Sequence, residues 1–313
     1  MRPSDGYITY IINPKSGASS RKLASRQFQH YLRARGYDVR THTTISLRHA
    51  CELATSAAGD PACALVVAAG GDGTVREVAR GLEGSDTALL VAPSGTENLL
   101  ANELGFDRRV ETLIAAFEGG TIRDLDLCTA DGKCFASIAG FGFDGAVVDL
   151  VTRRRTGHIN YFDYLHPLWR TFWSYGFEPM TVEVDGREVF SGPGLAFVGN
   201  ISRYAIGLQI LHYADFGDGL LDICIYKCRG RAHLVKHSVL TVLKHHANRR
   251  DVLYLQGKHV TVSSPHDVKT EIDGDPGPAL PVHISVVPSA VRCLVPAGAK
   301  PAGIRRRILR SLR

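Results

Sequence analysis

Three loops rich in small polar residues and glycine occur within the first hundred residues, and each follows an apolar run of strand length. The loops are 12–17 (INPKSG), 70–74 (GGDGT) and 93–98 (PSGTEN). Each loop also precedes a segment with the apolar spacing of a helix. A repeated order of strand, loop and helix predicts a parallel sheet covered by helices, because parallel strands need long crossover connections. The loops should therefore lie together along the carboxyl edge of that sheet.

The first third of the chain is expected to form an α/β domain. The predicted strands are 7–13, 37–44, 64–70 and 88–93. The predicted helices are 21–36, 47–59, 75–84, 98–105 and 108–120. We expect this domain to cover residues 1–125.

The pattern changes after residue 125 to segments in which apolar and polar residues alternate. These segments are 133–141, 180–190, 194–200, 220–228, 258–264, 268–275 and 282–287. Alternation with period two predicts strands with one buried face, and Asp185-Gly186 is a strong hairpin signal. Residues 126–296 are therefore expected to form an antiparallel β domain that carries one basic helix at 231–250.

Composition limits the class of protein. The chain has 313 residues, 44% of them hydrophobic, and its seven cysteines form no CxxC pair. Such scattered cysteines are typical of a cytoplasmic protein with reduced thiols. No apolar run approaches the roughly 20 residues needed to span a bilayer.

The charge of the chain is concentrated in places that suit a membrane surface. The net charge is +6, and residues 304–313 (IRRRILRSLR) have the pattern of a basic amphipathic helix. We expect a helix at 297–313 that packs back on the first domain. Attraction to anionic lipid is favoured for the tail over nucleic acid, because no nucleic-acid-binding motif accompanies the charge.

The residues of the three loops suit phosphate. Glycine-rich turns expose backbone N–H groups, and the following helices add their positive N-terminal dipoles. The small donors are Asn13, Ser16, Gly17, Gly70, Gly71, Gly73, Thr74, Gly95 and Thr96. Asp72 cannot face phosphate directly, so it suits a metal ion, a bound water or a ribose hydroxyl.

Other motifs are absent or weak. The chain has no Walker A sequence and no HExxH, so neither a P-loop nor that zinc site is expected. Residues 140–145 (GFGFDG) match G-x-G-x-x-G, but they open the antiparallel half rather than a βαβ unit. Close backbone packing is favoured there over dinucleotide binding.

The ordered set of motifs resembles the diacylglycerol kinase catalytic-domain family, which includes bacterial diacylglycerol kinases, sphingosine kinases and ceramide kinases. That family is related to NAD kinases and phosphofructokinases, which share GGDGT. The resemblance extends from INPKSG and PSGTEN to YADFGDGLLDICIY at 213–226 and EIDGDPGP at 271–278. It implies an α/β nucleotide domain followed by an antiparallel β-sandwich, and phosphorylation of a lipid hydroxyl with ATP and Mg²⁺.

The resemblance also implies roles for individual residues. Nucleotide binding is implied for Asn13, Ser16, Gly17, Thr44, Gly70, Gly71, Asp72, Gly73, Thr74 and Thr96. Metal binding is implied for the Asp218 carboxylate and for the backbone carbonyls of Asp215 and Leu220. Asp275 stands where the family usually has a glutamate as the proposed base, and Asp72 is expected to contribute to catalysis.

The sequence departs from the family pattern at several positions. Arg76 replaces a frequent asparagine, Leu99 replaces a common acid, and Asp275 is one methylene shorter than glutamate. Asp126 is retained, and it either supports the site or pairs within the fold. Two alternatives stay open: an NAD or sugar-phosphate kinase, which would share the GGDGT loop, and a non-catalytic lipid-binding regulatory protein, which the departures at Leu99 and Asp275 leave open.

A lipid substrate requires access to a membrane. Residues 153–177 contain both tryptophans, six other aromatic residues and several arginines. Aromatic residues beside cations suit the headgroup region, although an aromatic stripe can equally belong to a core. We expect a protein at the periphery of an anionic membrane, with a homodimer left open.

Overall fold

The computed structural model describes residues 6–17, 22–153 and 161–299, and the chain divides into two compact units. Of the described residues, unit 1 contains those up to Leu127, Phe216–Asp218 and 287–299. Unit 2 contains Cys128–Asp215 and Gly219–Val286. The predicted C-terminal helix at 297–313 falls almost entirely outside the described residues.

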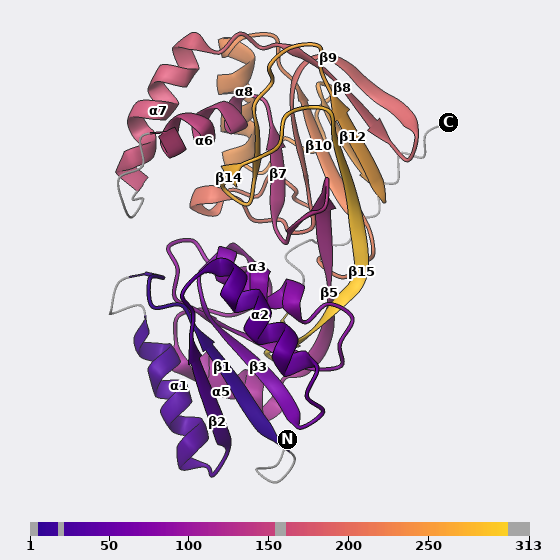
Figure 1. The fold of residues 1–313 in the computed structure, drawn as a ribbon. Helices are drawn as coiled ribbons and strands as arrows, with labels where there is room; N and C mark the ends of the chain where they lie inside the picture. The colour runs from indigo at the N-terminus through magenta and orange to yellow at the C-terminus, as the bar shows by residue number, and fades with distance from the viewer. Residues whose placement is uncertain (1–5, 18–21, 154–160, 300–313) are drawn as a thin grey trace. The chain divides into compact units, whose positions relative to one another are not determined.

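Unit 1 contains a parallel sheet with the neighbour order β4-β3-β1-β2. Figure 1 labels its strands β1, β2 and β3. Its strands are β1 (Tyr7–Ile12), β2 (Asp38–Thr43), β3 (Cys63–Gly70) and β4 (Ala88–Pro93). Its helices are α1 (Leu23–Ala34), α2 (Leu47–Ala58), α3 (Asp72–Gly81), α4 (Leu99–Glu103) and α5 (Val110–Gly119). The end of a later strand, β15, pairs in parallel with β4 through Cys293 and Leu89. The predicted α/β architecture is confirmed.

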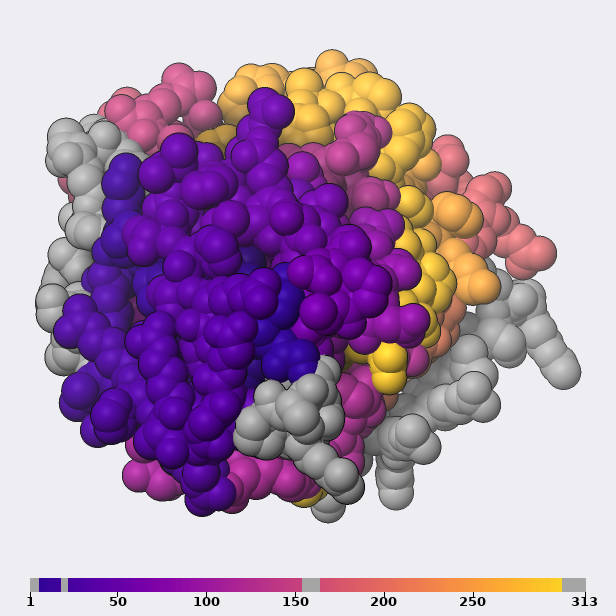
Figure 2. Space-filling view, turned by 60° about the horizontal axis from the view of Figure 1, so that its bottom comes forward, coloured from indigo at the N-terminus to yellow at the C-terminus, as the bar shows by residue number. Residues whose placement is uncertain are grey.

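The central strands are apolar because helices cover them. Val66, Val67 and Ala68 of β3 are fully buried, as a strand covered on both faces requires. Gly81 brings α3 against α2, since a Cβ there would lie 2.5 Å from the Cys51 carbonyl oxygen. Figure 2 shows the surface of unit 1, with its N-terminal residues in indigo and purple.

Unit 2 is built from antiparallel strands in two sheets. The strands are β5 (Thr121–Ala130), which begins in unit 1, β6 (Lys133–Phe135), β7 (Ile138–Phe141), β8 (Pro179–Val184), β9 (Arg187–Gly199), β10 (Leu221–Lys227), β11 (Val252–Gly257), β12 (His259–Ser263), β13 (Thr270–Ile272), β14 (Asp275–Pro276) and β15 (Val282–Val295), which ends in unit 1. One layer contains β8, β12 and β15, and the other contains β7, β10, β11, β13 and β14. The long strand β9 pairs with β8 in the first layer and with β7 and β10 in the second.

The two layers enclose an apolar core, which confirms the predicted β-sandwich. Phe135, Phe141, Val182, Ile223 and Val262 are among its buried residues. Alternating residues of each strand point inward, as the period-two pattern requires.

The hairpin predicted at Asp185-Gly186 connects β8 to β9. Asp185 has φ 49° and Gly186 has φ 77°, and the flanking residues Val184 and Arg187 are paired. Positive φ at both central residues is the geometry of a type I′ turn, which asparagine, aspartate and glycine favour.

Unit 2 has more helices than the sequence predicted. α6 (Phe143–Arg153) and α7 (Tyr161–Ser174) precede α8 (Arg231–Val242), and Figure 1 shows the three helices on one side of the unit's strands. The helix predicted at 231–250 ends early, because Lys244 adopts φ 57°. No described helix is long and apolar enough to cross a membrane.

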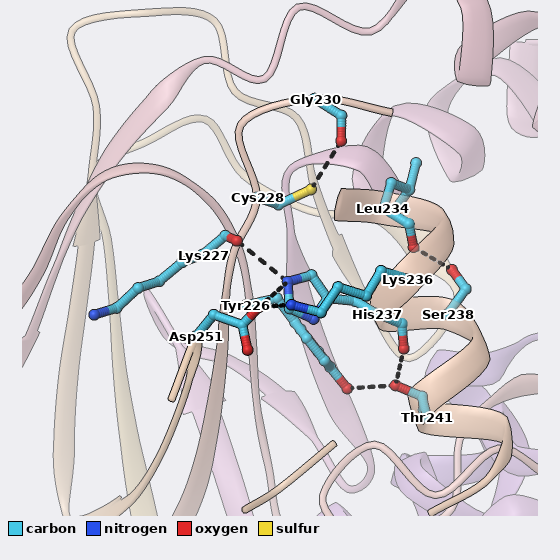
Figure 3. A network of polar contacts seen from close by, with 10 residues as sticks. All are labelled: Tyr226, Lys227, Cys228, Gly230, Leu234, Lys236, His237, Ser238, Thr241 and Asp251. Carbon is cyan, nitrogen blue, oxygen red and sulfur yellow. Dashed lines mark hydrogen bonds and ion pairs between the residues drawn. The ribbon is translucent and has the colours of Figure 1, made fainter. Parts of the chain in front are cut away.

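Polar contacts fix the inner face of α8 (Figure 3). His237 is buried, and its Nε2 lies 3.2 Å from the carbonyl oxygen of Lys227. The Tyr226 hydroxyl lies 2.9 Å from the hydroxyl of buried Thr241. Burial lowers the pKa of His237, so a neutral ring that donates from Nε2 fits this site. These contacts leave the opposite face of α8 toward solvent.

Candidate active site

The three predicted phosphate loops lie next to one another at the carboxyl ends of β1, β3 and β4. The register aligns Ile12 with Ala69 and Gly70 with Pro93, so the three strands end at nearly the same level. Beyond the strands, the Asn13 N–H donates to the Ala69 carbonyl at 2.9 Å. The Ser94 N–H likewise donates to the Gly70 carbonyl at 2.9 Å.

Glycine is required where the second and third loops meet. A Cβ on Gly95 would lie 2.6 Å from the Gly71 Cα, closer than real atoms approach. A Cβ on Gly70 would lie 2.4 Å from the Thr74 side chain. Gly70 of GGDGT and Gly95 of PSGTEN therefore have a steric reason that a simple turn does not explain.

Side chains connect the first loop to the other two. Asn13 Nδ2 donates to the Thr74 hydroxyl at 2.8 Å, and the Ser94 hydroxyl donates to that of Ser16 at 3.2 Å. Gly17 has φ 63°, which favours glycine at the end of the described loop. The residues predicted from the first and second loops are thus brought together.

Asp72 is the first residue of α3 and is half-buried. Its Oδ1 accepts the Leu100 N–H at 3.1 Å, which connects α3 to α4. A carboxylate at a helix N-terminus interacts favourably with the helix dipole. Asp72 therefore has a structural contact in addition to any role toward a ligand.

The third loop is held by residues that the sequence analysis did not select. Asn98 adopts φ 56°, and its side chain both accepts the Gly95 N–H at 2.7 Å and donates to the Gly95 carbonyl at 3.1 Å. Arg108 donates to the carbonyls of Gly95 and Thr96. Thr96 itself is exposed. Asparagine's tolerance of left-handed backbone was the available signal for Asn98.

Thr44 follows β2 and is buried beside the first loop. Its N–H donates to the carbonyl of Ile12 at 2.8 Å, which extends the pairing of β1 with β2 by one residue. The structure therefore brings Thr44 to the same edge of the sheet as the three loops.

Arg76 has a structural environment that the sequence did not reveal. It is only 4% exposed, and its Nε lies 3.4 Å from the Glu77 carboxylate within α3. A buried guanidinium without a carboxylate partner is costly, so Glu77 compensates the replacement of the family's usual asparagine.

The segment that contains the predicted metal ligands runs along the start of β5. The Asp126 N–H donates to the Phe216 carbonyl at 2.8 Å, and the Asp126 carboxylate accepts the Ser289 N–H at 2.7 Å. A Cβ on Gly217 would lie 2.5 Å from the Asp124 carbonyl oxygen. Asp126 thus supports the fold next to this segment.

The predicted metal ligands have the chemistry that Mg²⁺ prefers. Asp218 is exposed, Asp215 and Leu220 are half-buried, and Gly219 has φ 74°. In the described ranges no cluster of three or more His, Cys, Asp or Glu side chains could hold a metal. The predicted set uses one carboxylate and two backbone carbonyls, and such oxygen donors fit Mg²⁺ together with water.

Asp273, Gly274 and Asp275 form the hairpin that connects β13 to β14. Asp273 and Gly274 have φ of 51° and 79°, and Ile272 pairs with Asp275. The Asp273 carboxylate accepts the N–H groups of three successive residues, at 3.0–3.3 Å: Ala136, Ser137 and Ile138. Asp275 follows this fixed turn and is half-buried, so its carboxyl starts from a well-defined backbone position.

The GFGFDG segment is explained by packing within unit 2. A Cβ on Gly140 would lie 2.4 Å from Asp144 Oδ2, and one on Gly145 would lie 2.4 Å from the Lys269 carbonyl oxygen. Gly142 has φ 109°. The three glycines therefore permit close contacts between β7, α6 and the chain around β13, as the packing interpretation expects.

Two acidic residues of unit 2 were missed by the sequence analysis. Glu271 is fully buried on β13, and Asp144 is in the first turn of α6. Tyr204 donates its hydroxyl proton to Asp144 Oδ2 at 2.7 Å. Burial raises the pKa of Glu271 well above its ordinary value, and the neighbouring Asp144 carboxyl raises it further. The signal in the sequence was a charged residue between Thr270 and Ile272, where the strand is buried on both sides.

An α/β unit with three loops at one sheet edge, followed by a β-sandwich, is the domain order that two family models of a kinase class describe. The model for the diacylglycerol kinase catalytic domain matches residues 7–130. The model for the YegS C-terminal NAD kinase beta sandwich-like domain matches residues 137–295. The chain belongs to the diacylglycerol kinase family of lipid kinases.

Individual relatives extend over nearly the whole chain. The diacylglycerol kinase of Mycobacterium tuberculosis (strain ATCC 25618 / H37Rv) is 31% identical over 307 residues, covering 93% of this chain and 96% of its own. That of Bacillus subtilis (strain 168) is 28% identical over 284 residues, covering 87% and 90%. The crystal structure of a diacylglycerol kinase from Bacillus anthracis str. Sterne has a TM-score of 0.72 at 19% identity, covering 92% of this chain and 96% of that one. This last likeness concerns the fold.

Proposed function

We propose that the protein transfers the γ-phosphoryl group of ATP to the hydroxyl of a membrane lipid, with diacylglycerol as the first candidate. The observation that carries the proposal is the contact of the three loops, where a side chain on Gly95 would collide with the backbone of Gly71. Bare backbone at a helix N-terminus is suited to phosphate. The relatives named diacylglycerol kinase support the choice of acceptor.

The nucleotide would bind to unit 1. Backbone N–H groups of GGDGT and the N-terminus of α3 would face phosphate oxygens, while the first and third loops add small polar side chains. The proposed binding residues are Asn13, Ser16, Gly17, Thr44, Gly70, Gly71, Asp72, Gly73, Thr74 and Thr96. Asp72 would orient the phosphates through water or a cation rather than by direct contact.

Mg²⁺ would be held by the Asp218 carboxylate and the carbonyls of Asp215 and Leu220. When bound, the ion supplies positive charge that offsets the negative charge of the phosphates. The oxygen donors and the fixed path of the chain at Asp126 support this assignment.

Asp275 would accept the proton of the lipid hydroxyl as general base. The turn that Asp273 holds sets the direction of its backbone, and its half-buried position leaves the carboxyl accessible to a substrate. A positioned carboxylate is worth about 10²–10⁴-fold in rate.

An acceptor panel tests the proposed function. Purified protein, labelled ATP and Mg²⁺ would be incubated with diacylglycerol, sphingosine, ceramide and NAD. We expect label in a lipid, with diacylglycerol preferred. Label in NAD alone would contradict the proposal, and no transfer with retained vesicle binding would favour a regulatory protein.

Two helices of unit 2 display apolar side chains that suit contact with the membrane. Of thirteen large hydrophobic side chains exposed in the described ranges, eight are on or directly after α7 and α8. They are Leu165, Leu168, Trp169, Trp173, Val235, Val239, Val242 and Leu243. Leu165, Trp169 and Trp173 recur at spacings of four residues, and Val235, Val239 and Val242 at spacings of four and three, so each set forms one stripe. We call the two stripes the α7–α8 surface.

Arg231 connects the two stripes. Its Nε donates to the Phe172 carbonyl at 3.0 Å, and its guanidinium carbon lies 5.3 Å from the centre of the Trp173 ring. Lys236 is exposed at the border of the α8 stripe, where Figure 3 shows it directed toward Asp251. Arg170 is exposed beside the α7 stripe. Tryptophan with flanking cations fits the interface of an anionic bilayer, which we propose as the partner of this surface.

Replacing Trp169 and Trp173 together by alanine is expected to weaken binding to phosphatidylserine-containing vesicles by about tenfold or more, because each ring loses apolar contact with lipid. Flotation measures the bound fraction. The control replaces Ile45 and Ile122, which are exposed on unit 1, by alanine. Equal binding by both double variants would reject the α7–α8 surface. Deletion of 304–313, which lies outside the described residues, separately tests the basic tail.

A further inference from the structure

The side chain of Glu271 is fully buried. Its Oε2 accepts the Gly274 N–H at 2.8 Å, while Oε1 has no hydrogen-bond partner among the described residues. A buried oxygen without a donor is costly for an ionised carboxylate. It must therefore be decided whether Glu271 is ionised or protonated in the folded protein.

Asp144 is the group that faces the second oxygen of Glu271. A Cβ built on Gly140 would lie 2.4 Å from Asp144 Oδ2 and 2.9 Å from Glu271 Oε1, so the two carboxyl oxygens border the same point. Gly140 is paired opposite Glu271 in the sheet. Any side chain at residue 140 would occupy the space where the two carboxyls meet.

The groups that act electrostatically on this pair are acidic or neutral. Glu271 is influenced by Asp144 on α6 and by Asp273 in the turn, and Asp144 accepts from Tyr204. Tyr164 of α7 acts on Tyr204. Two adjacent carboxylates in a site of low polarity do not both ionise, because repulsion adds to the loss of hydration.

We propose that Glu271 is a carboxylic acid at neutral pH, that its O–H donates to the Asp144 carboxylate, and that it positions the Asp273–Asp275 turn through the Gly274 N–H. The proton supplies the missing partner of Oε1, and Oε2 remains the acceptor for Gly274. Glu271 acts through Asp275 and is a positioning residue. This part of the inference rests on the proposed function, whereas the protonation state does not.

Glu271→Gln is the central test, because an amide reproduces the protonated acid. Its –NH₂ can donate to Asp144, and its carbonyl oxygen can accept from Gly274. We expect kcat and KM for lipid phosphorylation to stay within about twofold of the original protein. Glu271→Leu, of similar size but without polar atoms, is expected to lower kcat about tenfold or more with KM for ATP unchanged. Glu188→Gln, on an exposed residue of β9, is the matched control.

The pH dependence of unfolding tests the proton without reference to activity. A folded-state pKa above the unfolded value means that the folded protein keeps a proton which the unfolded chain releases. Stability is therefore full below the unfolded pKa, about 4.3, and is lost as pH rises toward the folded pKa. We therefore divide the unfolding equilibrium constant of the original protein by that of Glu271→Gln. This ratio should rise about tenfold per pH unit between the unfolded and the folded pKa of Glu271.

The outcomes distinguish the protonation state of Glu271 from its positioning role in catalysis. A ratio that does not change with pH shows an ionised Glu271 and overturns the proposal. A folded but inactive Glu271→Gln overturns it too, because a carboxylate would then be needed. Should the original protein phosphorylate no acceptor, the unfolding experiment still decides the protonation of Glu271, and the proposed function alone fails.

Discussion

Asp72→Asn is expected to lower kcat for lipid phosphorylation by about 10²-fold or more, with little loss of stability. The amide removes the negative charge that would orient the nucleotide phosphates through water or a cation. Its carbonyl oxygen can still accept the Leu100 N–H that Asp72 accepts at 3.1 Å, so the connection of α3 to α4 is retained. Turnover at saturating ATP and Mg²⁺ measures the effect, and thermal unfolding measures the fold.

Asp86→Asn is the matched control for this variant. Asp86 belongs to the same unit, its side chain is fully exposed, and it pairs with Arg292 at 3.1 Å. It precedes the amino end of β4, whereas the three loops follow the carboxyl ends of their strands. This change should leave turnover unaltered, since exposed ion pairs contribute little. Near-normal turnover of Asp72→Asn would remove Asp72 from the site, even if the rest of the proposed nucleotide site were correct.

Asp275→Ala is expected to lower kcat by about 10²–10⁴-fold, because it removes the proposed base. The hairpin should survive, since Asp273 and Gly274 form the turn and Asp273 holds three backbone N–H groups. Asp275→Glu restores the residue usual in the family and should retain activity, with one added methylene of reach. The measurement is kcat against pH for all three proteins.

Asp267→Ala controls for the loss of a carboxylate in unit 2. Asp267 is exposed and pairs with Lys269 at 2.7 Å. A low kcat that is independent of pH in both Asp275 variants would show that the residue acts by shaping the turn. An active Asp275→Ala protein would assign the base to another group.

The sequence predicted most strands of both units because their patterns reflect burial directly. The apolar run of β3 indicates a strand covered on both faces, and alternation in β8 indicates one covered face. Asp185-Gly186 predicted its hairpin because few residue pairs adopt positive φ at both central positions. The helices of unit 2 were harder to predict. A proline lies within α7, and α8 ends at a left-handed lysine, so neither has an unambiguous pattern.

The candidate site was likewise predicted only in part from the sequence. Motif spacing along the chain was sufficient to predict that INPKSG, GGDGT and PSGTEN meet at one edge of a sheet, since parallel strands place their ends together. Motif spacing could not show that residue 95 must lack a side chain because the Gly71 backbone lies against it. That contact joins residues 24 positions apart through the register of β3 with β4. Asn98 and Arg108 hold the third loop for reasons that appear only in space.

The sequence alone therefore determined most strands of both units, the family and the loops that are proposed to bind phosphate. These features depend on local periodicity and on residues whose backbone preferences act over a few positions. The tertiary structure alone decided the burial of Arg76, the support that Asp126 gives to Phe216, and the close approach of Glu271 to Asp144. Their electrostatic state depends on burial and on neighbours brought together by folding, which no local pattern records.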